Sequence, residues 1–315
     1  MMVYLAKRLA ALVPVLLGVT IVTFSLTLLV PGDPVRLMLG DGATPDAIAK
    51  LREQLHLNGR VDARYYAWLT HVLHGDFGNS ISTGQPARDV MARAIENTGK
   101  LAIAAIIVAI LVGVTTGLLL AVLPGVASRP LNVWVVSAMS VPSFWLALVF
   151  LYLFAVQNRW FPTGGMGPII GGGGLATTLH YLVLPALAVS VLPTALVARL
   201  TRTLVLELRR QDFVLMLQAR GYSRLRIWRH LLRNAAPGIV NIVGLQAGDV
   251  FLGAVFVEVV FSWPGVGSTV VSAIEARDFP VIQALVLATG TIFALTTILT
   301  DLLIRALDPR LEAHG

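Results

Sequence analysis

The 315-residue chain contains no cysteine, which excludes disulfides, thiolate metal sites and cysteine nucleophiles. Charge is also scarce, because Asp, Glu, Lys and Arg make up 13% of the residues, about half of what a typical soluble domain carries. Hydrophobic residues make up 56%, and the mean hydropathy is +0.79. This composition excludes an ordinary soluble globular protein and predicts an integral membrane protein.

Signatures of catalysis are lacking as well. The stretch ENTGKL (96–101) looks like the end of a phosphate-binding loop, but Ala94 stands where the loop needs its first glycine and Leu101 where it needs Ser or Thr. Neither a serine nucleophile elbow nor a His-Glu-x-x-His pattern occurs. His71 and His74 could share one helix face, yet no third ligand follows at metal spacing, so we expect solvated histidines. The sequence predicts no enzyme and no metal or cofactor bound by this chain.

Long apolar runs are what the sequence has in abundance. A transmembrane helix needs about 20 mostly apolar residues. Six stretches qualify: 9–30, 98–123, 132–157, 181–201, 236–261 and 281–306. The first is too long for the apolar core of a signal peptide and lacks a cleavage site, so we expect a permanent helix. The predicted fold is an all-α integral membrane protein with six transmembrane helices.

Arginine and lysine indicate the orientation, because they accumulate in short cytoplasmic loops. Lys7 and Arg8 place the N-terminus in the cytoplasm, and six crossings then place the C-terminus there too. The loop between the fourth and fifth crossings agrees, since residues 199–233 hold nine arginines against Glu207 and Asp212. The loops at 158–180 and 262–280, which would be external, hold one arginine each.

The chain divides into three predicted parts: the first transmembrane helix (1–30), an external cap segment (31–97), and a five-helix core (98–315) with a cytoplasmic loop at 202–235. In the cap we expect an amphipathic helix carrying Ile48, Leu51 and Leu55, an aromatic run at 65–68, and a second helix from Pro86 into the next crossing. The glycine-rich stretch 164–174 is typical of a flexible loop.

Small residues, prolines and carboxylates stand out inside the apolar runs. Two G-x-x-x-G pairs, at 113/117 and 244/248, either mark close helix contacts or reflect the frequency of glycine in membrane helices. Pro142, Pro185 and Pro193 are expected to interrupt their helices. Glu258 and Asp301 lie close to helix ends and are expected at the membrane interface.

Asp249 lies in the middle of the fifth crossing, where a carboxylate exposed to lipid is costly. Two interpretations remain open. The carboxylate either lines a water-filled pathway and meets a cationic group of a substrate, or pairs with a Ser, Thr or Asn on a neighbouring helix.

The stretch LQARGYSRLRIWRHLLRNAAPG (217–238) concentrates five arginines and a histidine. Gly221 should end one helix and Ser223 should cap the next. At helical spacing Arg226, Arg229 and Arg233 form one stripe, with the apolar residues of 225–232 opposite. We expect a short amphipathic helix that ends before Pro237. It could lie on anionic lipid, bind nucleic acid or dock in a groove of a cytosolic protein.

This stretch resembles the cytoplasmic coupling motif of ABC importer permeases, in which Ala-x-x-x-Gly precedes a short helix and an Asn-x-x-Pro turn. Similar blocks run along nearly the whole chain: VPGDP (30–34), GDFGNSISTGQP (75–86), VPSFW (141–145), FSWPGVG (261–267), ARDFP (276–280) and DPRL (308–311). In combination they resemble the B-type subunits of the dipeptide and oligopeptide permease branch. The chain departs from the motif at 215–217, where Leu-Met-Leu replaces polar and small residues, and at Asp249, where the branch has a small or apolar residue.

The resemblance implies a type I importer transmembrane domain without catalytic activity in the bacterial cytoplasmic membrane. Implied partners are a homologous second permease subunit, two cytosolic ATPases that bind ATP and Mg²⁺, and an external substrate-binding protein; the implied cargo is a peptide. The residues that would couple to the ATPase are Ala219, Arg220, Gly221, Tyr222, Ser223, Leu225, Trp228, Arg229, Asn234 and Pro237. Candidates for the translocation pathway are Asp249, Gln246, Phe144 and Trp145. The alternative is a membrane receptor or scaffold whose basic loop binds anionic lipid or nucleic acid.

Overall fold

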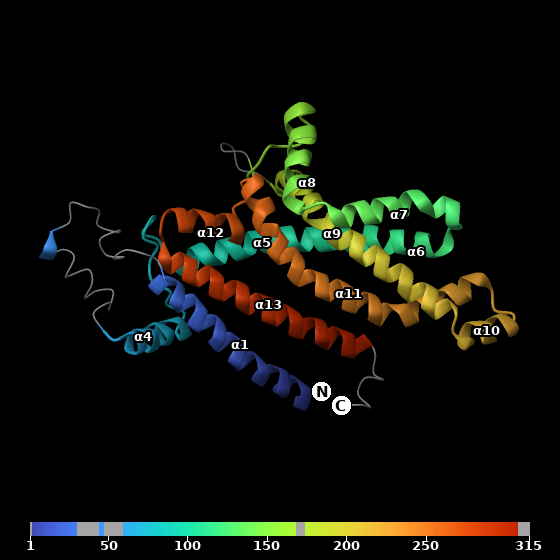
Figure 1. Ribbon diagram of the computed structural model, residues 1–315, viewed down its shortest axis with the longest axis horizontal. Helices are drawn as coiled ribbons and strands as arrows, with labels where there is room; N and C mark the ends of the chain where they lie inside the picture. Colours follow the sequence, from blue (N-terminus) through green and yellow to red (C-terminus); the bar gives the residue numbers. More distant parts are fainter. Residues whose placement is uncertain (1, 30–43, 47–58, 168–173, 308–315) are drawn as a thin grey trace. The chain divides into compact units, whose positions relative to one another are not determined.

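The computed structural model describes residues 2–29, 44–46, 59–167 and 174–307, and within these ranges every named element is helical (Figure 1). The chain folds into two compact units. The first comprises Met1–Ala94 and Thr269–Ala294, and the second Ile95–Ser268 and Leu295–Gly315. Two predicted features, the amphipathic helix with Ile48, Leu51 and Leu55 and most of the loop at 164–174, lie outside the described residues.

The first unit contains α1 (Met2–Leu29), α4 (Val61–Leu73), the start of α5 (Ala87–Val108), most of α12 (Val266–Glu275) and the first half of α13 (Phe279–Leu307). Aromatic rings join α4 to α1, because the Phe24 ring lies 5.5 Å from Tyr65 and 5.7 Å from Trp68, between centroids. Tyr65 and Thr20 also place their hydroxyl oxygens 2.8 Å apart. The aromatic run predicted in the cap therefore attaches α4 to the first apolar helix.

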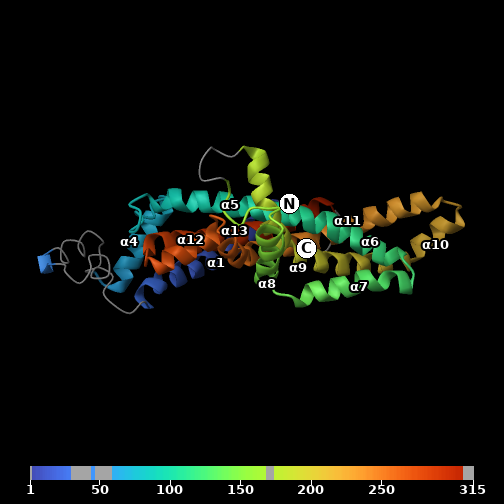
Figure 2. The same ribbon diagram turned by 90° about the horizontal axis from the view of Figure 1, so that it is seen from above.

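The second unit is built around α9 (Leu175–Arg209), which contacts α11 (Arg224–Val260), η1 (Ala109–Val114), α6 (Thr115–Val122), α7 (Gly125–Ser140) and α8 (Ser143–Phe150). In both views α6 and α7 lie side by side and cross α9 (Figures 1 and 2). A π-helical turn η2 (Leu151–Gln157) continues α8, and α10 (Asp212–Ala219) connects α9 to α11. The largest apolar cluster of this unit includes Leu101, Ala147, Leu184, Val257 and Trp263.

Among the described residues, four helical spans are long and apolar enough to cross a membrane: Ala87–Val122, Leu175–Arg209, Arg224–Val260 and Phe279–Leu303. The pair Gly125–Ser140 and Ser143–Gln157 counts as a fifth if one bent span is allowed, with a bend of 107°. The apolar part of α1, Ala10–Ser25, is shorter. An all-helical membrane protein is thus confirmed, while the count of six crossings stays a prediction.

Two predictions about proline were wrong. Pro142 does separate α7 from α8, but Pro185 and Pro193 lie inside the unbroken α9. The amphipathic helix expected to end before Pro237 instead continues through it as α11, to Val260. Proline removes one backbone hydrogen bond, a loss that membrane helices tolerate when neighbouring helices pack against them. The adjoining Gly238 touches α9 so closely that a Cβ there would come 2.6 Å from Leu204 Cδ2.

Close helix contacts occur at three of the four predicted glycines, Gly113, Gly117 and Gly244. A Cβ on Gly113 would come 2.9 Å from the Thr194 carbonyl oxygen, and one on Gly117 2.6 Å from that of Ala198, so this pair packs directly against the α9 backbone. Gly244 packs against Thr300 on α13 in the same way, since a Cβ on Gly244 would come 2.0 Å from Thr300 Cγ2. Small residues here allow the close backbone approach on which helix packing in membranes depends.

Candidate functional site

The basic stretch folds as a helix, a turn and a second helix. The turn closes α10 with two hydrogen bonds, from Gly221 N to the Gln218 carbonyl (2.9 Å) and from Tyr222 N to the Leu217 carbonyl (3.1 Å). This is a Schellman arrangement, which requires a left-handed residue, and Gly221 has φ +71°. Gly221 therefore ends the helix as predicted. Ser223 occupies the N-cap position of α11, but its hydroxyl makes no capping hydrogen bond, so that prediction was wrong.

The apolar side of this second helix divides into two parts. Leu231 is buried, and Trp228 packs against a cluster around Ala121, Val205 and Ala235 on α6, α9 and α11. Leu225, in contrast, is 81% exposed, and Leu232 is exposed too. Leu215 and Met216 on α10 are also exposed, and they are the residues at which the chain departs from the coupling motif. The helix thus has one packed face and one uncovered apolar face.

The cationic stripe is exposed, with Arg226, Arg229 and Arg233 all on the surface. The Arg226 guanidinium lies 5.7 Å from the centre of the Tyr222 ring, and that ring lies 6.2 Å from His230. Tyr222 therefore holds part of the stripe against the turn that contains Gly221. Ala219, Arg220 and Asn234 are exposed beside it, while Pro237 is half-buried inside α11.

At the other end of α11, Glu258 is fully buried, which contradicts its predicted place at the membrane interface. One carboxylate oxygen accepts a hydrogen bond from the Thr98 hydroxyl at 2.5 Å, and the other accepts from Gly267 N at 2.7 Å and Ser268 N at 3.4 Å. Thr98 Oγ1 in turn accepts from Val266 N at 2.7 Å. A buried carboxylate is tolerated when hydrogen bonds satisfy its oxygens, as they do here.

Trp263 and Asn97 complete this arrangement. The Trp263 indole N–H donates to the Asn97 carbonyl at 3.0 Å, and the Asn97 amide donates to the Pro264 carbonyl at 2.8 Å. There is no space for a side chain at position 265, because a Cβ on Gly265 would come 2.2 Å from Glu258 Oε1 and 2.5 Å from Thr98 Oγ1. We call residues 97–98, 258 and 263–268 the Glu258 knot. It explains the FSWPGVG block as a turn that joins the end of α11 to α5 and to the start of α12.

A second buried carboxylate belongs to the first unit. Asp278 Oδ2 accepts hydrogen bonds from the Ser80 hydroxyl (2.5 Å), the Ser82 hydroxyl (2.9 Å) and Ser82 N (3.2 Å). Burial alone would raise the pKa of Asp278, but these bonds and one from Ile81 N outweigh it, so the pKa lies below its ordinary value. The GDFGNSISTGQP and ARDFP blocks are therefore joined through one ionised side chain.

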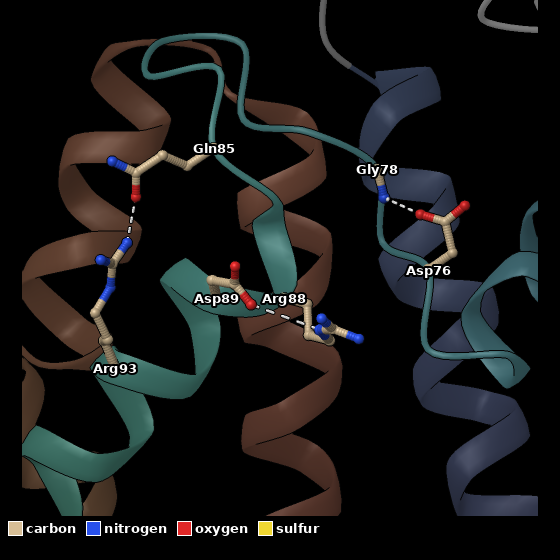
Figure 3. Close-up of polar contacts among 6 residues, drawn as sticks. All are labelled: Asp76, Gly78, Gln85, Arg88, Asp89 and Arg93. Atoms are coloured by element: carbon tan, nitrogen blue, oxygen red, sulfur yellow. Dashed lines mark hydrogen bonds and ion pairs between the residues drawn. The ribbon is translucent and has the colours of Figure 1, made fainter.

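The loop whose serines bind Asp278 has further polar contacts at its two ends (Figure 3). Asp76 Oδ1 accepts from Gly78 N at 2.9 Å, and the Arg93 guanidinium donates to the Gln85 side-chain oxygen. An isolated bridge pairs Asn79 with Pro86 across the loop. The second helix predicted from Pro86 is present as α5, so this loop leads directly into a candidate membrane span.

The pathway candidates lie in different surroundings. Asp249 is exposed on α11, between Leu245, Leu252 and Phe256 on the same face, all exposed. The structure brings one aromatic candidate to this face, since the Phe144 ring lies 6.4 Å from that of Phe256. Gln246 is buried instead, and its side-chain oxygen has no hydrogen-bond partner among the described residues. Trp145 is exposed on α8.

Metal-binding groups do not gather anywhere in the described part of the chain, where no three His, Asp or Glu side chains could hold an ion together. His74 Nδ1 instead lies 2.7 Å from the Thr70 carbonyl oxygen, at the end of α4. The ring of His74 is thus held by the backbone of the helix that it follows.

Comparison with known proteins gives consistent matches along the chain. Residues 109–313 match the family described as "Binding-protein-dependent transport system inner membrane component", and residues 1–101 match its N-terminal companion. The dipeptide transport system permease protein DppB of Alkalihalophilus pseudofirmus is 36% identical, with 99% of this chain and 100% of that protein covered. A probable peptide ABC transporter permease of Sinorhizobium fredii is 34% identical (98% and 99% covered), and Escherichia coli DppB is 31% identical (99% and 99%).

Among solved structures, the inward-facing MetNI methionine ABC transporter aligns with a TM-score of 0.56. The alignment covers 69% of this chain and 96% of that chain at 18% sequence identity. At this identity the likeness shows a shared helical fold and no more.

Proposed function

We propose that this chain transports di- or oligopeptides. The chain belongs to the family of inner membrane components of binding-protein-dependent transport systems, so it is a non-catalytic permease subunit of an ABC transporter. The family implies ATPase and binding-protein partners. The names of three relatives at 31–36% identity, each a dipeptide or peptide permease, support a peptide cargo. The receptor or scaffold alternative has no comparable support.

In the proposed assembly, this chain pairs with a homologous second permease, two cytosolic ATPases bind ATP and Mg²⁺, and an external binding protein delivers the peptide. The N- and C-termini and the basic stretch face the cytoplasm, as the arginine distribution predicts. Glutathione or nickel complexes are the competing cargoes, and uptake assays with the matching binding protein distinguish them.

The uncovered apolar face of residues 212–235 is the observation that supports ATPase docking. Leu215, Met216, Leu225 and Leu232 are exposed next to a cationic stripe, and this combination suits a groove in a partner protein. Trp228 packs the opposite side of the helix against α6 and α9, so movement of the docked helix would reach the membrane helices. The unbroken α11 supports the same mechanism, because its first turns, residues 224–235, which we call the docking helix, and its membrane span form one continuous helix.

Asp249 supports a pathway at the exposed face of α11. An exposed carboxylate in the middle of a candidate span is costly against lipid, so this face is better suited to water or to the second permease. Phe144 joins the same surface through Phe256, and we assign Trp145 to it on the strength of its exposure. Gln246 is buried away from this face, and its role in the pathway has less support.

The experiment is affinity purification of the tagged chain from native membranes, with two matched variants. Leu225→Asp places a charge on the proposed docking face, whereas Leu175→Asp changes a leucine of similar exposure, 78%, at the start of α9. We expect the wild type and Leu175→Asp to retain a second permease and an ATPase, and Leu225→Asp to lose only the ATPase. Purification of the wild-type chain alone would contradict the proposed assembly.

A further inference from the structure

Arg209, the last residue of α9, contacts two other helices at once. Its guanidinium donates to the Ala121 carbonyl oxygen at 2.8 Å. Ala121 lies in the last turn of α6, where carbonyl groups have no partner within their own helix, and a cation at a helix C-terminus is favoured by the helix dipole. Arg209 therefore caps the point at which α6 turns back into α7.

The same guanidinium lies 5.8 Å from the centre of the Trp228 ring, in the second turn of α11. A planar guanidinium can stack on an aromatic ring and donate in its plane, which a lysine ammonium cannot do in one geometry. Arg209 consequently links the docking helix to the α6–α7 hairpin, although these two elements are about 100 residues apart in sequence.

Arg202 provides an internal comparison two turns earlier on α9. It donates to Asn132 Oδ1 on α7 at 2.8 Å, and Asn132 donates to the Ser128 carbonyl at 3.0 Å. This hydrogen bond joins α9 to the hairpin and does not involve α11. The contacts of Arg209, in contrast, extend to the helix that carries the exposed leucines.

We propose that Arg209 is a positioning residue that transmits displacement of the docking helix to the α6–α7 hairpin. The inference rests on the proposed ATPase docking at residues 212–235. When an ATPase moves α11, the Trp228 ring moves the Arg209 guanidinium that stacks on it. The guanidinium then moves the end of α6 through its hydrogen bond to the Ala121 carbonyl. Without this link the hairpin would follow only through apolar packing, of Trp228 against the end of α6 and of α9 against α6 and α7, and part of each ATPase cycle would be lost as motion that moves no peptide.

The test compares Arg209→Gln, Arg209→Lys and the control Arg210→Gln in the complete transporter, reconstituted in liposomes with its binding protein. Arg210 is the exposed neighbour, and in the described part of the chain its side chain makes no hydrogen bond or ion pair. Peptide uptake and ATP hydrolysis are measured together, so that their ratio reports coupling. We expect Arg209→Gln to assemble and hydrolyse ATP, with uptake per ATP reduced about fivefold. Arg209→Lys should fall between it and the control.

A double variant tests the route. Since Arg209 is proposed to act through the Trp228 ring, Arg209→Gln combined with Trp228→Leu should reduce the ratio little further than Arg209→Gln alone. Equal ratios for Arg209→Gln and Arg210→Gln would overturn the inference, as would loss of the ATPase from both Arg209 variants, which would show a role in assembly instead. Either result would leave the proposed function intact, because the proposed function is contradicted only if the wild-type permease purifies without an ATPase.

Discussion

The two ends of α11 are built in opposite ways. At its C-terminal end Glu258 is buried, hydrogen bonds satisfy both carboxylate oxygens, and Gly265 leaves no room for a methyl group. At its N-terminal end Leu225 is exposed, and the arginines of the stripe lie on the surface. The difference indicates that the C-terminal end is complete within this chain, whereas the N-terminal end requires a partner to cover it.

The middle of α11 resembles its N-terminal end, because its carboxylate is also exposed. Asp249 and Glu258 are both carboxylates on α11, nine residues apart, but Asp249 is exposed where Glu258 is enclosed. A carboxylate with its own buried donors has a structural role. One without them, on an otherwise apolar face, is placed to meet water, cargo or a second subunit.

The largest effect should come from disrupting the Glu258 knot. We expect Gly265→Ala to destabilise the chain by about 3 kcal/mol or more, because the new Cβ would collide with the Glu258 carboxylate and the Thr98 hydroxyl, neither of which has free space. Gly253→Ala is the matched control, since nothing lies within 4 Å of a Cβ built at that position on α11. Thermal unfolding of the two variants in detergent measures the difference. Equal unfolding midpoints for Gly265→Ala and Gly253→Ala would mean that the Glu258 knot has room for an added methyl group.

The smallest effect should come from Asp249→Asn, which removes the charge and preserves the shape. We expect normal stability and normal uptake of neutral peptides, with uptake of cationic peptides reduced about threefold to tenfold, as expected for the loss of a screened charge contact of about 1 kcal/mol. Competition between lysine-containing and neutral peptides in one uptake assay measures this selectivity directly. Unchanged selectivity would favour the alternative, a carboxylate that pairs with a neighbouring helix.

The sequence was informative where local geometry dictates the residue. Gly221 could be predicted because only a left-handed residue closes the Schellman turn, and Gly113 and Gly117 because close helix packing needs small side chains. Composition was enough to predict the membrane class. The family followed from blocks spread along the chain, each uninformative on its own.

Long-range contacts could not be predicted from one sequence. Glu258 was expected at the membrane interface because it lies close to a helix end. Its partner Thr98 is 160 residues away, and nothing in the local pattern reveals their contact. The same holds for Asp278 and Ser80, which are 198 residues apart. Pro237 was misread because the local rule for proline takes no account of tertiary packing, here the close approach of Gly238 to Leu204 on α9.

Cross-linking to the ATPase tests the contrast between the two ends of α11 most directly. The natural chain has no cysteine, so Leu225→Cys carries a single thiol on the proposed docking face, and Leu175→Cys carries one at a leucine of similar exposure. A bifunctional thiol-to-amine reagent is applied to the complex assembled with its ATPase. We predict a cross-linked product of permease and ATPase for Leu225→Cys and none for Leu175→Cys. A product from Leu175→Cys alone would contradict the account.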